Sequence, residues 1–212
     1  MRYSLKSSMD KLSKDSTNHC TLQLKNMLCS CCLTIVSRLL EDEGAQVEHI
    51  TPGEVTFIYA PDNHSEAFYT DLLAAHGFES IHGREEQIVE HIKQAVVELV
   101  HEAGNVNSII RNSDYLVERL GLSYTYLSSV FTNYENLTLE RYIILHKIEK
   151  VKALIDYDEL TLSEIAIQLG YSSVQYLSNQ FRQVTGLTVS EYKKYPGNLR
   201  IPIDQLGKPL KS

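Results

Sequence analysis

The polar side chains between residues 175 and 182 recur at the spacing of one helix face. Four of them stand at positions i, i+3, i+4 and i+7: Gln175, Ser178, Asn179 and Arg182. A helix would present all four on the same side. A carboxamide can form paired hydrogen bonds with adenine in the major groove, whereas a guanidinium is suited to a phosphate group. The set predicts a helix surface that reads double-stranded DNA, with Gln175 and Asn179 as the base contacts and Arg182 at a phosphate.

The surrounding residues predict the two helices that position this face. Thr161 and Glu164 form the T-x-x-E capping-box pattern, which satisfies free N–H groups at the start of a first helix. Gly170 stands where a left-handed residue would end that helix. We expect Ser172 and Gln175 to cap the second helix through the similar S-x-x-Q pattern. Apolar residues recur at inward positions of both helices: Leu162, Ile165, Ala166, Leu169, Leu177, Phe181 and Val184. The pattern is typical of a helix-turn-helix.

The same unit occurs twice in the chain. Residues 126–131 (YLSSVF) echo residues 176–181 (YLSNQF). The echo continues downstream at the same interval, with Leu137, Thr138 and Tyr142 matched by Leu187, Thr188 and Tyr192. A duplicated unit is much harder to obtain by chance than a single motif. The reading face of the first copy carries only hydroxyl side chains, without Lys or Arg, so we expect it to contribute less affinity: Thr125, Ser128, Ser129 and Thr132.

Residues 105–194 resemble the AraC-type transcriptional regulators. The most specific match is IAIQLGYSSVQYLSNQFRQVTGLTVSEY, at residues 165–192. In that family two helix-turn-helix units joined by a long helix bind DNA. The resemblance therefore implies an all-α DNA-binding domain, a connecting helix over residues 139–155, and the function of a sequence-specific transcriptional regulator. Two positions depart from the family pattern: Val189 replaces the usual proline, and Asn136 replaces a common glycine.

A cluster of cysteines offers a second kind of chemistry. Cys29, Cys31 and Cys32 lie within four residues. Cys29 and Cys32 stand at i and i+3 where a loop enters a helix, so their thiols can converge on one ion, whereas Cys31 is rotated away. We expect the helix start to lower the thiol pKa and so favour the thiolates. Paired soft thiolates suit Cu(I), and Zn(II) would need further ligands. A redox pair and a loop that binds nothing are the alternatives.

The segments around these cysteines predict a small α+β domain. Alternating and helical patterns indicate, in order, a strand, a helix, two strands, a helix and a short last strand: residues 20–24, 33–40, 47–50, 55–59, 68–75 and a position near Ser80. This order favours a ferredoxin-like βαββαβ domain.

The cysteine loop also resembles that of the heavy-metal-associated domains. Met27, Cys29 and Cys32 match the family's M-x-C-x-x-C signature, and residues 77–79 (GFE) match its Gly-aromatic-acidic ending. The resemblance implies metal binding by Cys29 and Cys32, and we expect Met27 to fill the core beneath the loop. The family's glycine before the methionine is Asn26 here, and the additional Cys31 is not part of the pattern.

We expect a multidomain α+β protein. Its parts are a flexible lead-in (residues 1–18), the ferredoxin-like domain (19–83), a connecting amphipathic helix (84–104), the DNA-binding domain (105–195) and a mobile tail (196–212). The helix carries one apolar stripe: Ile88, Ile92, Ala95, Val96, Leu99, Val100 and Ala103. We expect this stripe to pack within the chain, with the seam of a homodimer as the alternative.

Composition and charge limit the function classes. The net charge of −7 is unevenly distributed. Residues 1–104 carry eight Lys and Arg against sixteen Asp and Glu, whereas residues 105–200 carry ten of each. We therefore expect modest, salt-sensitive DNA binding unless a dimer adds contacts. No catalytic motif occurs, so we expect no enzyme. No apolar run is long enough for a membrane, and the first residues lack a signal-peptide pattern, which favours a cytoplasmic protein. The alternatives are a metal-trafficking protein with a helical interaction module, and a regulator whose N-terminal domain is purely structural.

Overall fold

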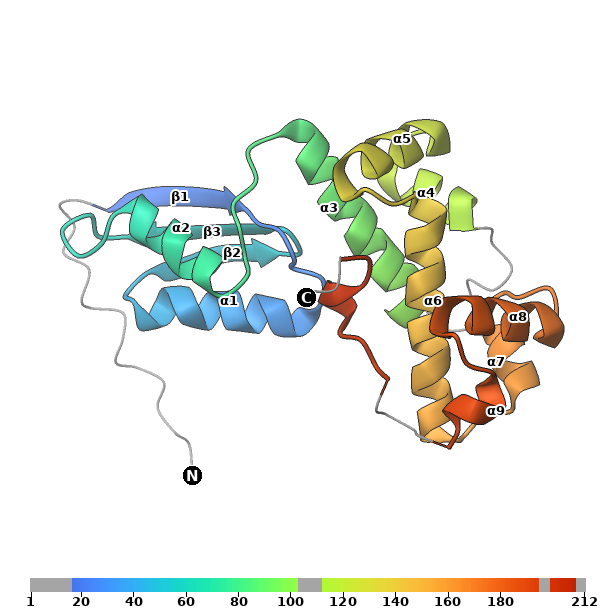
Figure 1. Ribbon diagram of the computed structural model, residues 1–212. Coiled ribbons are helices and arrows are strands. Elements are labelled where there is room, and N and C mark those ends of the chain that lie inside the picture. Colours follow the sequence, from blue (N-terminus) through green and yellow to red (C-terminus); the bar gives the residue numbers. More distant parts are fainter. Residues whose placement is uncertain (1–16, 103–111, 195–198, 209–212) are drawn as a thin grey trace, which may run out of the picture. The chain divides into compact units, whose positions relative to one another are not determined.

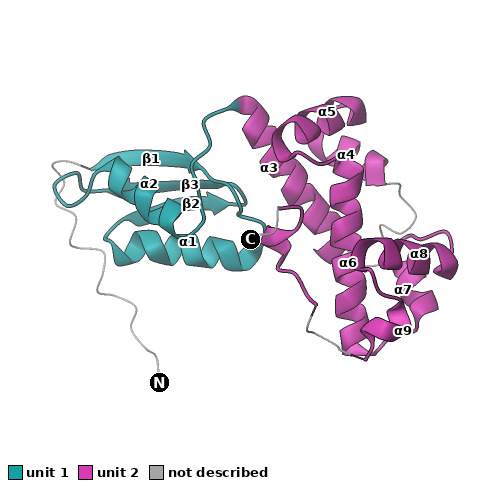
Figure 2. Ribbon diagram, viewed as in Figure 1, with its two compact units in different colours: residues 1–83 teal, residues 84–212 magenta. Residues whose placement is uncertain are grey.

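The computed structural model describes residues 17–102, 112–194 and 199–208 (Figure 1). The chain divides into two compact units, residues 1–83 (unit 1) and 84–212 (unit 2) (Figure 2). None of the described helices is long and apolar enough to cross a membrane.

Unit 1 contains an antiparallel sheet with the strand order β1-β3-β2. The strands are β1 (Asn18–Gln23), β2 (Gln46–Thr51) and β3 (Glu54–Tyr59). Side chains alternate between the two faces of a strand, so Val55, Phe57 and Tyr59 of β3 all enter the core. In the turn between β2 and β3, Gly53 has a φ of +85°, a conformation that favours glycine.

Two helices complete the core of unit 1. They are α1 (Ser30–Asp42) and α2 (Glu66–Ala75). Val36 and Leu40 of α1 and Tyr69 and Leu73 of α2 are buried in the same cluster as Phe57. The predicted order of strand, helix, strand, strand and helix is therefore present in the structure.

The last element of the predicted βαββαβ order is reduced to an isolated bridge. Leu24 pairs with Ser80, and single backbone hydrogen bonds flank the bridge, from Lys25 N to Glu79 O and from Ile81 N to Gln23 O. The next helix begins at Arg84, so the chain leaves the sheet edge before a longer ladder can form. The described part of unit 1 thus has three strands, and a single bridge at Ser80 stands where the short last strand was expected.

Unit 2 is helical in its described part. Its helices are α3 (Arg84–Val97), α4 (Asn112–Leu120), α5 (Tyr124–Glu135), α6 (Leu139–Tyr157), α7 (Leu162–Gln168), α8 (Val174–Thr185) and α9 (Val189–Tyr192). A π-helical turn, η1 (Glu98–Glu102), follows α3, and a 3₁₀ turn, η3 (Ile203–Gln205), lies near the end of the chain.

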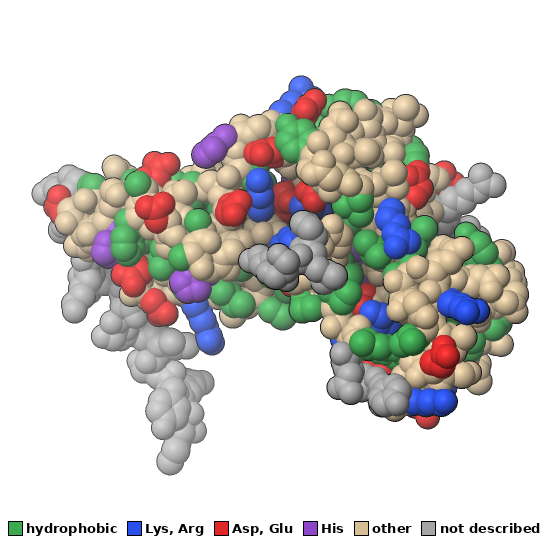
Figure 3. Space-filling view, in the orientation of Figure 1, with side chains coloured by type: hydrophobic (Ala, Val, Ile, Leu, Met, Phe, Trp, Pro, Cys, Tyr) green, Lys and Arg blue, Asp and Glu red, His purple; other side chains and the backbone are tan. Residues whose placement is uncertain are grey.

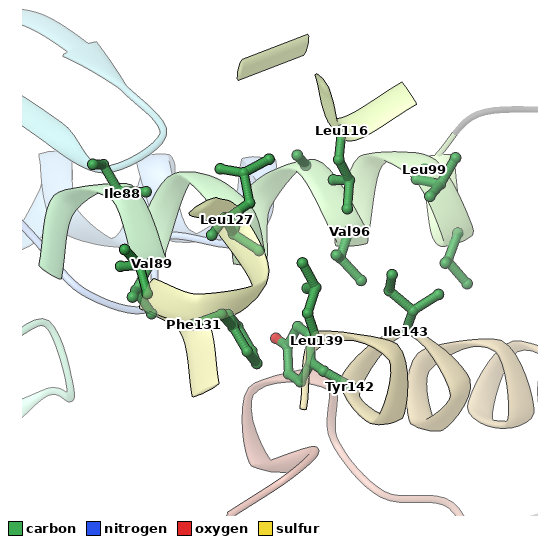
Figure 4. Close-up of a cluster of buried hydrophobic side chains, with 14 residues drawn as sticks. Ile88, Val89, Val96, Leu99, Leu116, Leu127, Phe131, Leu139, Tyr142 and Ile143 are labelled. Atoms are coloured by element: carbon green, nitrogen blue, oxygen red, sulfur yellow. The ribbon is translucent and has the colours of Figure 1, made fainter. Parts of the chain in front are cut away.

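The long helix α6 takes part in both hydrophobic cores of unit 2. The first core joins α3, α4 and α5 to the start of α6 and includes Phe131 and Tyr142 (Figure 4). The second joins the rest of α6 to α7, α8 and α9 and includes Phe181 and Tyr192. Each core therefore belongs to one copy of the duplicated sequence.

The amphipathic helix predicted for residues 84–104 belongs to the first of these cores. In Figure 4, Val96 of α3 points toward α6, and Ile88 belongs to the same cluster of buried side chains. Of the predicted stripe, the six residues from Ile88 to Val100 are buried, and Ala103 lies outside the described residues. The stripe thus packs within unit 2, and its buried side chains are not open to a dimer partner.

The end of the chain differs from the predicted mobile tail. Residues 199–208 lie against α6: Lys152 Nζ donates to the Leu199 carbonyl at 2.8 Å, and Arg200 pairs with Glu149. The Glu149 carboxylate is 1% exposed and also accepts from Lys152 and from the Ile201 backbone N–H. A buried charge must be paired, and Arg200 and Ile201 supply partners for Glu149. The expectation of a mobile tail is therefore wrong for residues 199–208. Residues 196–198 and 209–212, like the lead-in up to residue 16, lie outside the described residues.

The buried carboxylate of Glu149 should matter strongly for stability. Glu149→Ala would leave the buried Lys152 ammonium without its carboxylate and should lower the free energy of unfolding by ~3–5 kcal/mol. Urea unfolding followed by helical circular dichroism measures this loss. The control is Lys193→Ala, which breaks the exposed pair with Asp158 and should cost less than ~1 kcal/mol. Similar losses for both variants would contradict the role given to Glu149.

Candidate nucleic-acid interface

The second helix-turn-helix consists of α7, a glycine turn and α8. Thr161 Oγ1 accepts from Glu164 N, and the Glu164 carboxylate accepts from Thr161 N, so the predicted capping box is present. Gly170 has a φ of +68°, as predicted for the residue that ends α7. The backbone N–H groups of Gly170 and Tyr171 donate to the carbonyls of Ile167 and Ala166, which closes the helix end.

The start of α8 lies one residue later than the S-x-x-Q pattern predicts. Ser173 is the N-cap, and its hydroxyl accepts from Tyr176 N at 3.1 Å. The capping role predicted for Ser172 and Gln175 is therefore wrong. Two adjacent serines gave two possible registers, and Ser173 fits because its extended backbone precedes the first helical residue. Gln175 instead donates from Nε2 to Asn179 Oδ1 at 3.1 Å.

The predicted reading face of α8 lies on its solvent side. Gln175, Asn179 and Arg182 are exposed, whereas Leu177 and Phe181 on the opposite side are fully buried. The hydrogen bond between the two carboxamides links neighbouring turns of the face and orients both groups. The structure thus brings the three side chains together on one surface.

Ser178, the fourth predicted residue of this face, is half-buried. Its hydroxyl donates to the Val174 carbonyl of the preceding turn at 2.9 Å. This bond uses its only donor, so the oxygen retains acceptor capacity alone.

The first helix-turn-helix consists of α4, a turn at Gly121 and α5. Ser123 caps α5 by accepting from Tyr126 N, and Gly121 has a φ of +67°. A shallow hollow of about 490 Å³ lies along the outer side of α5, lined by Tyr124, Thr125, Ser128, Ser129, Thr132 and Asn133. All four predicted residues of this face line the hollow. Thr125 and Ser129 are exposed, while the half-buried Thr132 donates its hydroxyl back to the Ser128 carbonyl.

The two helix-turn-helix units repeat the same packing. Phe131 lies against Tyr142 with ring centroids 5.0 Å apart, and Phe181 lies against Tyr192 at 5.5 Å. In each helix-turn-helix, a phenylalanine of the predicted reading helix packs on a tyrosine of the helix that follows it. The duplication in the sequence is therefore also a duplication of the core.

The two departures from the family pattern occupy special backbone positions. Asn136 has a φ of +55°. Gly186, at the equivalent position of the second helix-turn-helix, adopts the same left-handed conformation with a φ of +77°. Asparagine tolerates this conformation better than most residues. Val189 is the first residue of α9, directly after the cap Thr188. Proline is favoured at that position, yet the capping box between Thr188 and Glu191 forms without it.

Sequence reasoning missed two exposed tyrosines beside the reading faces. Tyr126 on α5 is 40% exposed, and Tyr176 on α8 is 54% exposed. Their equivalence in the duplication was the available signal, because two aromatic residues at matching outer positions are not needed by either core.

Charged side chains are sparse on the predicted reading face of α8 and around it. On the face drawn in Figure 3, the Lys and Arg side chains of the described part of unit 2 are scattered among uncharged atoms. Hydrogen bonds from the backbone and side chain of Thr188 lower the pKa of Glu191, and Arg182 adds to this effect. A single guanidinium and two carboxamides thus give the predicted reading face of α8 a polar character with little net charge.

The two predicted metal ligands of unit 1 lie together. Cys29 Sγ and Cys32 Sγ are 3.1 Å apart, and the Cys32 thiol donates to the Asn26 carbonyl at 3.6 Å. Cys31 is exposed, and Met27 is fully buried. Burial, followed by the hydrogen bond with Cys32, raises the pKa of Cys29, so the expected lowering at the helix start is wrong for this thiol. Among the described residues no three His, Cys, Asp or Glu side chains gather as a metal-binding group.

The corrected cap of α8 can be tested directly. Ser173→Ala removes the acceptor for Tyr176 N and should destabilise unit 2 by ~1 kcal/mol. Ser172→Ala is the matched control, and at an exposed position without a cap bond it should cost less than ~0.5 kcal/mol. Urea unfolding of both variants measures the difference. A larger loss for Ser172→Ala would restore the register predicted from the sequence.

The comparisons with known proteins concern the helical half. Residues 116–195 match a family model described as a helix-turn-helix domain. The F1 operon positive regulatory protein of Yersinia pestis is 29% identical over 102 residues, which cover 48% of this chain and 33% of that protein. The Msm operon regulatory protein of Streptococcus mutans is 26% identical over 99 residues, or 47% of this chain and 34% of that protein. The chain thus spans about a third of the length of these relatives.

A solved structure is also similar, the C-terminal domain of AraT, a response regulator from Geobacillus stearothermophilus. The match covers 53% of this chain and 88% of that domain, with 24% identity and a TM-score of 0.44. The matched family model, the capped helices and the duplicated core agree: the C-terminal half of this chain carries a helix-turn-helix domain related to those of operon regulatory proteins.

Proposed function

We propose that this protein is a sequence-specific DNA-binding transcriptional regulator of AraC type. The observation that carries the proposal is the pair of capped helix-turn-helix units, each with a polar outer helix face, on the shared helix α6. The relatives named as operon regulatory proteins support it.

In this proposal α5 and α8 are the reading helices and enter successive major grooves, which lie about 34 Å apart on one face of the duplex. The exposed carboxamides of Gln175 and Asn179 suit the paired hydrogen bonds that adenine offers. Arg182, one turn further along, suits a phosphate. The hydroxyl face of α5 adds contacts without charge, so most of the base discrimination comes from α8.

The competing hypothesis is a metal-trafficking protein whose helical half binds another protein. A helix that docks in a protein groove presents apolar anchors at helical spacing. The outer face of α8 instead presents Gln175, Asn179 and Arg182, with Tyr176 at its flank. This composition favours DNA. Because the helical half has no net charge, we also propose a homodimer, which would double the DNA contacts.

For unit 1 we propose a ferredoxin-like domain that binds Cu(I) through Cys29 and Cys32. The strand order β1-β3-β2 and the bridge from Leu24 to Ser80 support the fold. The facing thiols support the site. Two sulfur ligands suit Cu(I), whereas a structural Zn(II) site takes four ligands, and no group of three metal-binding side chains occurs among the described residues. Bound Cu(I) would act as a signal only if it changed the DNA affinity.

The DNA proposal predicts separate roles for two residues of α8. Asn179→Ala should relax the sequence preference and cost ~1–3 kcal/mol at one base pair. Arg182→Ala should weaken binding to all duplexes and flatten the salt dependence by about one unit. Selection from random duplexes, followed by titration of the selected and scrambled sites, measures both effects. Ser128→Ala on α5 is the comparison and should change less than Asn179→Ala. A uniform loss for both α8 variants would contradict the assignment.

The thiol proposal predicts one equivalent of Cu(I) per chain. Cys29→Ser and Cys32→Ser should each abolish tight binding, because each removes one of the two facing ligands. Cys31→Ser is the matched control and should retain it. Competition with a Cu(I) chelator measures affinity and stoichiometry. Equal affinity in the wild type and the Cys29→Ser, Cys32→Ser double variant would remove the metal from the proposal. DNA affinity that is the same with and without Cu(I) would mean that bound Cu(I) is not a signal for DNA binding.

A further inference from the structure

Unit 2 contains a groove between its two helix-turn-helix units. Its volume is about 430 Å³. Tyr124 at the start of α5 borders it on one side, and Tyr176 and Gln180 of α8 border it on the other. The middle of α6 contributes Lys147. In Figure 1, α5 lies near the start of α6 and α8 lies further along it. The groove therefore separates the two proposed reading helices.

Lys147 is a half-buried cation that forms no ion pair within the described part of the chain. Its Nζ donates to the Leu169 carbonyl at 2.9 Å and lies 5.5 Å from the centroid of the Tyr171 ring. Burial lowers the pKa of this ammonium. Among the described residues no carboxylate lies within ion-pair distance of Lys147. Removing a charge from water is costly unless a counter-charge is supplied, so the geometry favours an external anion at this position.

Two other lysines of unit 2, the half-buried Lys93 and the buried Lys152, show the contrast. Lys93 pairs with Glu90 and Glu135, and Lys152 pairs with Glu149. Each of these two lysines therefore has a carboxylate of the fold as its partner. Lys147 is held only by a carbonyl oxygen and an aromatic ring face, both of which orient an ammonium without neutralising it.

We propose that this groove holds a phosphodiester of bound DNA, with Lys147 as its charged contact. The inference rests on the proposed function, in which α5 and α8 occupy successive major grooves. The sugar-phosphate backbone between those grooves must then pass the space between the two helices. The Tyr176 hydroxyl and the Asn112 amide, which also line the groove, supply neutral donors for phosphate oxygens.

One acidic residue opposes this contact. Glu140 lines the same groove, and its carboxylate accepts from the Tyr124 hydroxyl at 2.8 Å. A negative charge near a phosphate is repulsive, so Glu140 weakens the binding that Lys147 strengthens. The two residues must therefore affect DNA affinity with opposite signs.

The test compares Lys147→Gln and Glu140→Gln in the full-length chain on a duplex selected by the wild type. Lys147→Gln should weaken binding roughly fivefold at 0.15 M salt, equally for selected and scrambled sites, and should reduce the slope of log K against log salt by about 0.9. Glu140→Gln should strengthen binding by roughly twofold or more at the same salt concentration. A merely structural disturbance would not strengthen binding, so the opposite signs separate the two explanations.

Two controls complete the design. Lys147→Arg keeps the charge and should retain the wild-type slope. Lys150→Gln alters another α6 lysine that donates to a backbone carbonyl, that of His101, and does not line the groove. It should leave affinity and slope unchanged, and thermal unfolding of each variant checks the fold.

Each other outcome overturns the proposal. An unchanged slope for Lys147→Gln, weaker binding by Glu140→Gln, or an equal loss for Lys150→Gln would remove the phosphate contact while leaving the DNA-binding function intact. Stabilisation of the wild type by inorganic phosphate that Lys147→Gln abolishes, with unaltered DNA affinity, would assign the groove to a small anion. A wild-type protein that binds no duplex would overturn the proposed function and this inference together.

Discussion

The arrangement of unit 2 depends on the burial of α6 in two hydrophobic cores at once. Leu139, Tyr142 and Ile143 enter the first core, and Ile148, Val151 and Ile155 enter the second. A helix of 19 residues is about 28 Å long at 1.5 Å per residue. Because neither core can form without its part of α6, the helix sets both the distance and the rotation between the two helix-turn-helix units. A two-site reader of the duplex needs this kind of fixed spacing.

Near the point along α6 where the two cores meet, the helix carries buried polar groups. His146 is fully buried and lies 3.2 Å from His101 of η1, measured between ring nitrogens. Burial lowers the pKa of His146 to about 3 and that of His101 to about 4, so both rings are neutral at ordinary pH. Glu149 follows with its partners from the chain end. The two hydrophobic cores are thus joined by a polar layer whose hydrogen bonds restrict how α6 can rotate.

Local signals predicted most of the secondary structure. Thr161 with Glu164 and the left-handed Gly170 marked the ends of α7, because caps and glycine turns depend on a few adjacent residues. The alternation in β1 and β3 predicted the sheet for the same reason. Ser173 was missed because adjacent serines satisfy the same local rule, and only packing selects the register.

Features that depend on distant residues could not be predicted in this way. Arg200 follows a proline-containing stretch that indicated a free tail, and its partner Glu149 lies far away in the sequence. The raised pKa of Cys29 likewise reflects burial, which loop sequence alone does not reveal. For the candidate site, periodicity predicted the exposed face of α8, whereas the groove around Lys147 requires four helices, α4, α5, α6 and α8, to be placed together.

The membership of α3 in the first core changes where the helical half of the chain begins. The resemblance in the sequence suggested a boundary near residue 105, and the matched family model starts at residue 116. A fragment cut at either position would lack Ile88, Ile92 and Val96, which are buried against α4, α5 and α6. It would expose the apolar inner side of the first helix-turn-helix to water. The smallest self-contained form of this half therefore begins at Arg84, where the boundary between the two compact units lies.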